Sequence, residues 1–252
     1  AHSQAPSPIS AVLSGVLLNT ALYGIFRVFV IANKTLEGKA EDLLTMFGLL
    51  SIAITVPFIL VQHDLKRMFA YSSVEHMGII VLGVGIGGTV GLYGALLHMF
   101  NHAMAKSLLF FAAGNVSQKY RSKQINRISG MLKAMPITGT VFLIAVFAIS
   151  GAPPFNVFLS EFTVMAAGFR EGRYAVTVAF LLFVVAIFSG MMFYAAKMAF
   201  GAPPEKLKKK EIDRWSTAAL FVPLAAVVLF GMYVPPFLND AIRQVSQIFQ
   251  GA

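Results

Sequence analysis

Two histidines and a lysine at four-residue spacing, His98, His102 and Lys106, lie within a largely apolar stretch, residues 96–114. In an α-helix, steps of four residues place side chains on one face, so these groups would follow one another over about 12 Å. All three can accept and release protons, and a cation in lipid costs at least about 2.5–3.5 kcal/mol. Their helix face must therefore contact protein or water. We interpret it as a buried proton relay; the alternative is a helix end whose lysine reaches the membrane surface.

The composition is that of an integral membrane protein. Of the 252 residues, 57% are hydrophobic and 12% are charged, whereas soluble domains contain about 25% charged residues. The chain has no cysteine, so it can form neither disulfides nor thiolate sites for zinc or iron–sulfur clusters. Redox chemistry is therefore expected on other subunits. The net charge of +9 does not indicate nucleic-acid binding, because most Lys and Arg lie in short segments between apolar runs.

Seven apolar segments are long enough to cross a bilayer. The predicted fold is an all-α, polytopic bundle of about seven transmembrane helices, forming a single integral membrane domain over residues 1–252. The predicted spans are 9–32, 43–62, 68–87, 90–116, 136–169, 175–198 and 215–234, and an amphipathic tail, 238–249, is expected at the membrane interface.

The fifth span is expected to be a broken helix. It is 34 residues long, more than one straight crossing needs, and it contains Gly151, Pro153 and Pro154. Proline removes a backbone donor and glycine tolerates unusual dihedral angles, and a break at membrane depth must face protein or a cavity. Such breaks recur in ion-coupled transporters. Glu161 follows the break by about two turns; the alternative is a proline kink with Glu161 at the outer surface.

Other polar side chains complete the candidate proton pathway. Glu75 and His76 are adjacent inside the third span and point to different faces of its helix, and Glu75 could instead neutralise a neighbouring cation. Histidine titrates near neutral pH, and burial disfavours the charged forms of lysine and glutamate, which suits reversible proton carriage. The set of candidate residues is Asn19, Glu75, His76, His98, His102, Lys106 and Glu161. A zinc site at His98 and His102 would lack a visible third ligand.

The distribution of cations predicts the orientation of the spans. Segments 62–68, 117–135 and 197–214 contain two, five and six Lys or Arg residues, thirteen in all. The segments at the opposite ends of the spans, 33–42, 88–90, 169–174 and 235–252, contain only five. Cytoplasmic loops are enriched in Lys and Arg, so the first span is expected to start inside and the C-terminus to lie outside. Lys66, at the membrane boundary, fits a topology anchor better than a pathway residue.

Three stretches resemble one known family. HMFNHAMAKSLLFFAAG (98–114) resembles the core helix of the antiporter-like subunits of respiratory complex I, Mrp antiporters and membrane-bound NiFe hydrogenases. DLKRMFAYSSVEHMGI (64–79) and GAPPFNVFLSEF (151–162) resemble two further signatures of that family. The VEHMG segment is most similar to the hydrogenase-associated branch, of the hydrogenase-4 or formate-hydrogenlyase type.

The resemblance implies two five-helix repeats of inverted topology. Residues 41–200 would form the second repeat, 9–32 the last helix of a mostly missing first repeat, and 215–234 a C-terminal helix. The opening residues, AHSQAPSPIS, resemble a segment from the middle of the family, so the chain is expected to be the C-terminal half of a longer subunit. The resemblance also implies that Glu161 terminates the proton pathway. Asn19 stands where complex I subunits often have lysine, which could interrupt it.

The implied function is proton translocation, with sodium as the other possible ion, in a redox-driven complex of a prokaryotic inner membrane. The resemblance implies a non-catalytic subunit beside other membrane subunits, with a NiFe centre and iron–sulfur clusters on its partners. An autonomous Na⁺/H⁺ antiporter subunit of the Mrp type is the alternative. A scaffold that has lost conduction is a third, which Asn19 favours.

Overall fold

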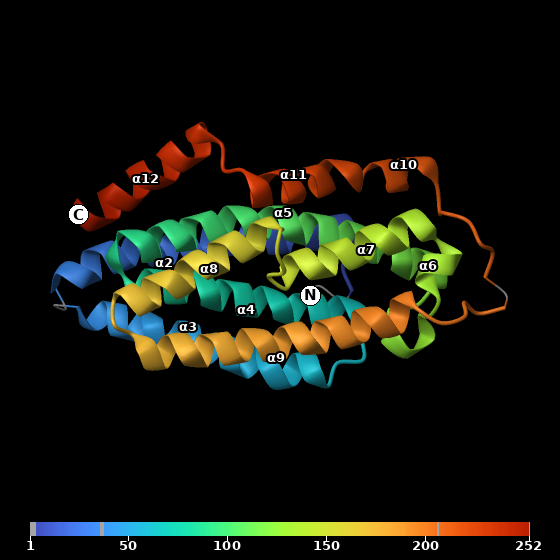
Figure 1. The fold of residues 1–252 in the computed structure, drawn as a ribbon, viewed down its shortest axis with the longest axis horizontal. Coiled ribbons are helices and arrows are strands. Elements are labelled where there is room, and N and C mark those ends of the chain that lie inside the picture. Colours follow the sequence, from blue (N-terminus) through green and yellow to red (C-terminus); the bar gives the residue numbers. More distant parts are fainter. Residues whose placement is uncertain (1–3, 36–37, 206, 252) are drawn as a thin grey trace.

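The chain folds into an elongated bundle of helices, as the computed structural model shows for residues 4–35, 38–205 and 207–251 (Figure 1). Apart from one isolated β-bridge between Asp64 and Gln124, the regular structure in these residues is helical. The predicted all-α class is confirmed. Ala1–Ser3 of the opening segment and Lys206 of the cationic loop lie outside the described residues.

The helices account for the predicted crossings. In the described part of the chain, five spans are long and apolar enough to cross a membrane: Ser7–Asn33, Lys39–Leu60 (α3), Leu65–Ile86 (α4), Tyr174–Ala199 (α9) and Arg214–Met232. The first consists of α1 (Ser7–Val12), a π-helical turn (Leu13–Leu17) and α2 (Leu18–Thr35), and the last of α10 (Arg214–Ala218) and α11 (Phe221–Met232). The remaining helices are α5 (Gly88–Tyr120), α6 (Met131–Ala134), α7 (Pro136–Ile149), α8 (Asn156–Arg170), α12 (Pro236–Gly251) and the 3-10 turn Ile125–Arg127.

Helix α5 is the centre of the bundle. It is 33 residues long and packs against α1, α4, α7, α8, α11 and α12 (Figure 1). Large apolar side chains are exposed on the surrounding helices, for example Val28 on α2, Leu182 on α9 and Val222 on α11. Such an outward apolar face suits contact with lipid. The polar face of α5 is enclosed by its neighbours.

Glycines allow α3 and α4 to pack closely. A Cβ at Gly48 would lie 2.6 Å from the backbone nitrogen of Leu82, and one at Gly85 would overlap the backbone nitrogen of Thr45. Small residues at a membrane helix interface let the two backbones approach, so that van der Waals contact holds the pair together. This antiparallel pair sets the position of the polar residues on α4.

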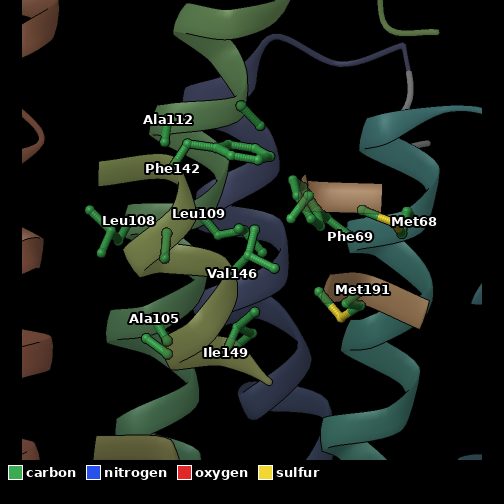
Figure 2. Close-up of a cluster of buried hydrophobic side chains, with 14 of the residues drawn as sticks. Met68, Phe69, Ala105, Leu108, Leu109, Ala112, Phe142, Val146, Ile149 and Met191 are labelled. Atoms are coloured by element: carbon green, nitrogen blue, oxygen red, sulfur yellow. The ribbon is translucent and has the colours of Figure 1, made fainter. Parts of the chain in front are cut away.

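The core between α4, α5, α7 and α9 is apolar. Figure 2 shows buried side chains from these helices meeting one another, among them Phe69, Leu109, Phe142, Val146 and Met191. The aromatic rings of Phe69 and Phe142 are 5.9 Å apart between centroids. Tight packing of this kind fixes the rotation of α4 and α5 and therefore the direction of their polar faces.

The fifth span is broken, as predicted. Helix α7 ends at Ile149 and α8 begins at Asn156, with irregular backbone between them. Gly151 has φ +73°, in the left-handed region, and the Pro153–Pro154 peptide bond is cis. At the other end of α7, Glu211 accepts hydrogen bonds from the backbone N–H groups of Ile137 and Thr138. The two short helices thus form one discontinuous crossing.

The C-terminal tail packs more closely than its sequence predicts. Its helix, α12, begins at Pro236 and lies against α5, and the Tyr93 hydroxyl donates a hydrogen bond to Asn239 Oδ1 at 2.9 Å. The Phe249 ring packs edge-on against Phe26 of α2, with centroids 6.2 Å apart. The tail therefore packs against other helices of the bundle.

Candidate functional site

The row of basic residues on α5 is fully enclosed. The side chains of His98, His102 and Lys106 all have 0% exposure. Lys106 Nζ donates hydrogen bonds to the carbonyl oxygen of Phe69 at 2.8 Å and to the hydroxyl of Ser72 at 2.5 Å. A lysine that reached the membrane surface is therefore excluded. Lys106 is held in the protein interior by α4.

Helix α4 brings two more titratable groups to this row. Glu75 and His76 are both buried, although they are adjacent and start on different faces of the helix. Glu75 is near enough to Lys106 and to Glu161 for their charges to interact, with attraction to the lysine and repulsion from the other acid. No ion pair joins Glu75 to Lys106 among the described residues. The structure thus gives Glu75 an electrostatic influence on Lys106.

Two histidines and an acid meet where α4, α5 and α8 converge. His76 Nδ1 and His98 Nε2 are 3.0 Å apart and share a hydrogen bond. Glu161 Oε1 lies 3.9 Å from the same nitrogen of His76. The His102 ring is 5.1 Å from the His76 ring, between centroids. Folding thereby collects side chains from three separate helices into one buried cluster.

The helix break makes room for Glu161. A Cβ on Gly151 would overlap Glu161 Oε2, so only glycine permits this carboxyl position. Glu161 is buried, not exposed at an outer surface. The backbone carbonyl of Ile149, at the end of α7, lies near the His76 side chain. Helix C-termini carry partial negative charge, so the break presents polar backbone to the cluster.

Several members of the cluster were not among the residues singled out from the sequence. Asn101 Nδ2 donates to the Asn156 carbonyl at 2.7 Å and to the Ser160 hydroxyl at 3.2 Å. Asn156 Nδ2 donates back to the Asn101 carbonyl at 3.2 Å. A sequence signal exists, since Asn156 and Ser160 are one turn apart on α8 and precede Glu161. These amides tie the start of α8 to the centre of α5.

Asn19 makes its hydrogen bonds to backbone and not to the histidines, among the described residues. Its Nδ2 donates to the backbone carbonyls of Gly15 and Met99 at 3.0 and 3.1 Å. Within the described part of the chain, no hydrogen bond joins it to His102. The nitrogens of His102 and the Asn19 Oδ1 atom are buried without protein hydrogen-bond partners among the described residues. Buried polar atoms of this kind are usually paired with ordered water.

The donor set also contains the elements of a metal site. Ligand atoms of His76, His98 and Glu161 all lie within 4.8 Å of one another. Folding thus offers three candidate ligands, of which only His98 belongs to the His98 and His102 pair considered from the sequence. A metal would need lone pairs on both ring nitrogens, whereas their 3.0 Å hydrogen bond requires a proton on one of them. The geometry therefore fits a proton-sharing histidine pair better than a metal centre.

Comparison with known proteins places this arrangement in a family. Residues 1–200 match the family described as NADH:quinone oxidoreductase/Mrp antiporter, TM. The chain is 36% identical over 255 residues to the hydrogenase-4 component F homolog of Methylacidiphilum infernorum, covering 99% of the chain and 52% of that protein. It is 37% identical over 186 residues to hydrogenase-4 component B of Escherichia coli, covering 69% and 28%.

The fold has a solved counterpart. The chain superposes on a subunit of the Mrp complex from Dietzia sp. DQ12-45-1b with a TM-score of 0.91, 17% sequence identity, and coverage of 100% of the chain and 55% of that subunit. These two relatives match this chain over nearly its whole length, and the chain spans about half of theirs. The family match over most of the chain and the 36% identity together decide its membership. The chain belongs to the transmembrane family of NADH:quinone oxidoreductase subunits and Mrp antiporters.

Proposed function

We propose that the chain is part of an antiporter-like membrane subunit that translocates protons in a redox-driven complex, most similar to a membrane-bound NiFe hydrogenase or formate hydrogenlyase. Family membership and the identity to two hydrogenase-4 components support this proposal. The chain has no cysteine, so a NiFe centre and iron–sulfur clusters belong on partner subunits. The chain's own contribution is to carry protons across the bilayer, beside other membrane subunits.

The observation that carries the proposal is the buried cluster of titratable side chains from Lys106 to Glu161. Lys106 interacts with Glu75 and with His102, and His76 lies beside His98 and Glu161. Each group can exist with or without a proton, so the cluster can pass protons from one member to the next. A proton on Lys106 favours ionised Glu75 and Glu161, and loss of that proton allows an acid to take one up. Charge states and connecting water suffice for this coupling.

Hydroxyl groups of α4 lie beside Lys106. The Ser72 hydroxyl contacts Lys106 Nζ, and the next residue, Ser73, shares a 2.7 Å hydrogen bond with the buried hydroxyl of Ser14. Hydroxyl groups both donate and accept hydrogen bonds. These groups support proton exchange at Lys106.

The orientation and repeat organisation belong to the same proposal. The excess of Lys and Arg in segments 62–68, 117–135 and 197–214 supports a cytoplasmic location for that end of the bundle, in a prokaryotic inner membrane. The C-terminus then lies outside. Residues 41–200 form one five-helix repeat, 9–32 the last helix of a preceding repeat, and 215–234 the C-terminal crossing.

Proton uptake by vesicles containing the complete redox complex tests the proposal. Electron flow should change the pH of the vesicle lumen. A protonophore should abolish this change, and removal of sodium should leave it unaltered. Wild-type complex without its electron donor is the control. Redox turnover without any ion movement would contradict the proposal and favour a scaffold that has lost conduction.

A second candidate function is autonomous Na⁺/H⁺ exchange. The Mrp complex subunit shares the fold over 100% of the chain, although at 17% identity this similarity concerns the fold alone. An exchanger would respond to an imposed sodium gradient without electron flow. Purification free of NiFe and iron–sulfur subunits, together with sodium-driven proton movement, would favour this alternative.

Gly151→Ala is expected to impair proton translocation by displacing the Glu161 carboxyl group. The new Cβ would overlap Glu161 Oε2, and the positive φ of +73° adds strain of about 1–2 kcal/mol. Gly172→Ala is the matched control, because Gly172 has φ +71° and a methyl group there would meet nothing within 4 Å. Both variants should lose thermal stability through the same backbone strain, Gly151→Ala the more because of the overlap, and only Gly151→Ala should lose translocation. Equal translocation by Gly151→Ala and Gly172→Ala would contradict the proposal that the helix break positions the Glu161 carboxyl group.

A further inference from the structure

Ser160 forms a clamp on one side of His98. Its hydroxyl is fully buried and lies 2.9 Å from His98 Nδ1. The same oxygen accepts a hydrogen bond from Asn101 Nδ2 at 3.2 Å and is 2.9 Å from the Val157 carbonyl, to which the hydroxyl can donate. A serine hydroxyl has one proton and two acceptor positions. When the Ser160 hydroxyl proton points at the Val157 carbonyl, the two acceptor positions of its oxygen are free for Asn101 Nδ2 and His98 Nδ1.

This hydrogen-bond pattern favours one placement of the protons in the histidine pair. If the Ser160 hydroxyl donates to Val157, the Nδ1 atom of His98 carries the proton that the serine accepts. Neutral imidazole has one N–H, so His98 Nε2 is then an acceptor. The 3.0 Å hydrogen bond must consequently come from His76 Nδ1–H. His76 Nε2 is left without a proton and without a hydrogen-bond partner among the described residues.

We propose that Ser160 is a positioning residue that makes His98 a side branch of the proton pathway and His76 the residue that passes protons to Glu161. This proposal rests on the proposed function. Beyond His98 the hydrogen bonds end at Ser160 and at a backbone carbonyl, which cannot hand a proton onward. Beyond His76 the next acceptor is Glu161 Oε1, 3.9 Å from Nδ1.

The transfer at His76 conserves protons. A proton from His102, whose ring centroid is 5.1 Å from that of His76, reaches the bare Nε2 atom through water and makes the His76 ring an imidazolium. The Nδ1 proton then passes to ionised Glu161, either after the 3.9 Å gap to Oε1 closes to hydrogen-bond distance or through a bridging water, and Glu161 becomes neutral. His76 is left as the neutral Nε2–H form. Release of the Nε2 proton to water and uptake of one from water at Nδ1 restore the starting tautomer with no net change in protons. His98 Nε2 favours that return because it accepts only from an Nδ1–H group.

The test compares Ser160→Val with Ser160→Thr in the complete redox complex. Threonine keeps the hydroxyl and valine replaces it with a methyl group of similar volume. Wrong histidine tautomers are costly in proton-transfer sites, so we expect translocation per electron to fall about tenfold in the valine variant and to stay within about twofold of wild type in the threonine variant. Nitrogen-15 spectra of labelled histidine should show that His98 loses its Nδ1–H form only with valine.

Two outcomes would overturn the proposal. Equal impairment by threonine and valine would mean that Ser160 matters only for packing, and wild-type translocation by valine would mean that the clamp has no role. If the valine variant does not assemble, Ser160→Ala removes the hydroxyl with less change in volume and is read against Ser160→Thr in the same way. Glu161→Gln in the same assay separates the two proposals, because an active Glu161→Gln complex contradicts the relay itself, whatever Ser160 does.

Discussion

Replacement of Glu161 by glutamine is expected to abolish most proton translocation while electron transfer continues. Glutamine keeps the shape and the hydrogen-bonding capacity of the side chain but cannot take up a proton. Glu161 is the acid next to His76, 3.9 Å from its Nδ1 atom, and folding has buried it beside the helix break. Removing a positioned proton acceptor costs about a hundredfold or more in rate. The ratio of translocated protons to transferred electrons measures the effect.

Glu171→Gln is the matched control for this variant. Glu171 lies ten residues further along, just beyond the end of α8, and is exposed. The same change of charge there should leave both translocation and redox turnover unchanged. Wild-type translocation by Glu161→Gln would show that this residue is a structural acid, and the route through His76 would then be wrong.

Replacement of Lys106 by methionine is expected to be as severe. Methionine has a similar length and fills the same apolar surroundings, but it carries no proton and donates no hydrogen bond to Phe69 or Ser72. Polar contacts between membrane helices average only about 0.6 kcal/mol, so the complex should still assemble. Translocation should fall by about a hundredfold, because the central exchangeable group is gone.

Lys66→Met controls for the loss of a buried lysine as such. The Lys66 side chain is 5% exposed and donates to the Ala5 carbonyl at 3.0 Å, but it lies at the start of α4 outside the cluster. Proton pumping should therefore survive in Lys66→Met and be lost in Lys106→Met. Lys106→Glu should be worse still, because it places another acid beside Glu75. A fully active Lys106→Met complex would remove the lysine from the pathway.

Local sequence signals predicted the elements of this molecule. The length of each apolar run indicates a crossing, because a bilayer must be spanned by about twenty residues of helix. Gly151, Pro153 and Pro154 predicted the break, because their backbone chemistry does not depend on neighbouring helices. The four-residue spacing of His98, His102 and Lys106 predicted a shared face for the same reason.

Contacts between helices were decided only by the tertiary structure. Adjacent residues such as Glu75 and His76 lie on different helix faces, but nothing in their spacing indicates that His76 meets His98 and Glu161 and that Glu75 lies near Lys106. Such contacts depend on how far each helix is rotated and shifted against α5, which packing at positions such as Gly48 and Phe69 determines. Ser160 is an example of a contact that local sequence does not predict. It becomes the hydrogen-bond partner of His98, 62 positions away, because α8 begins at Asn156 after the break.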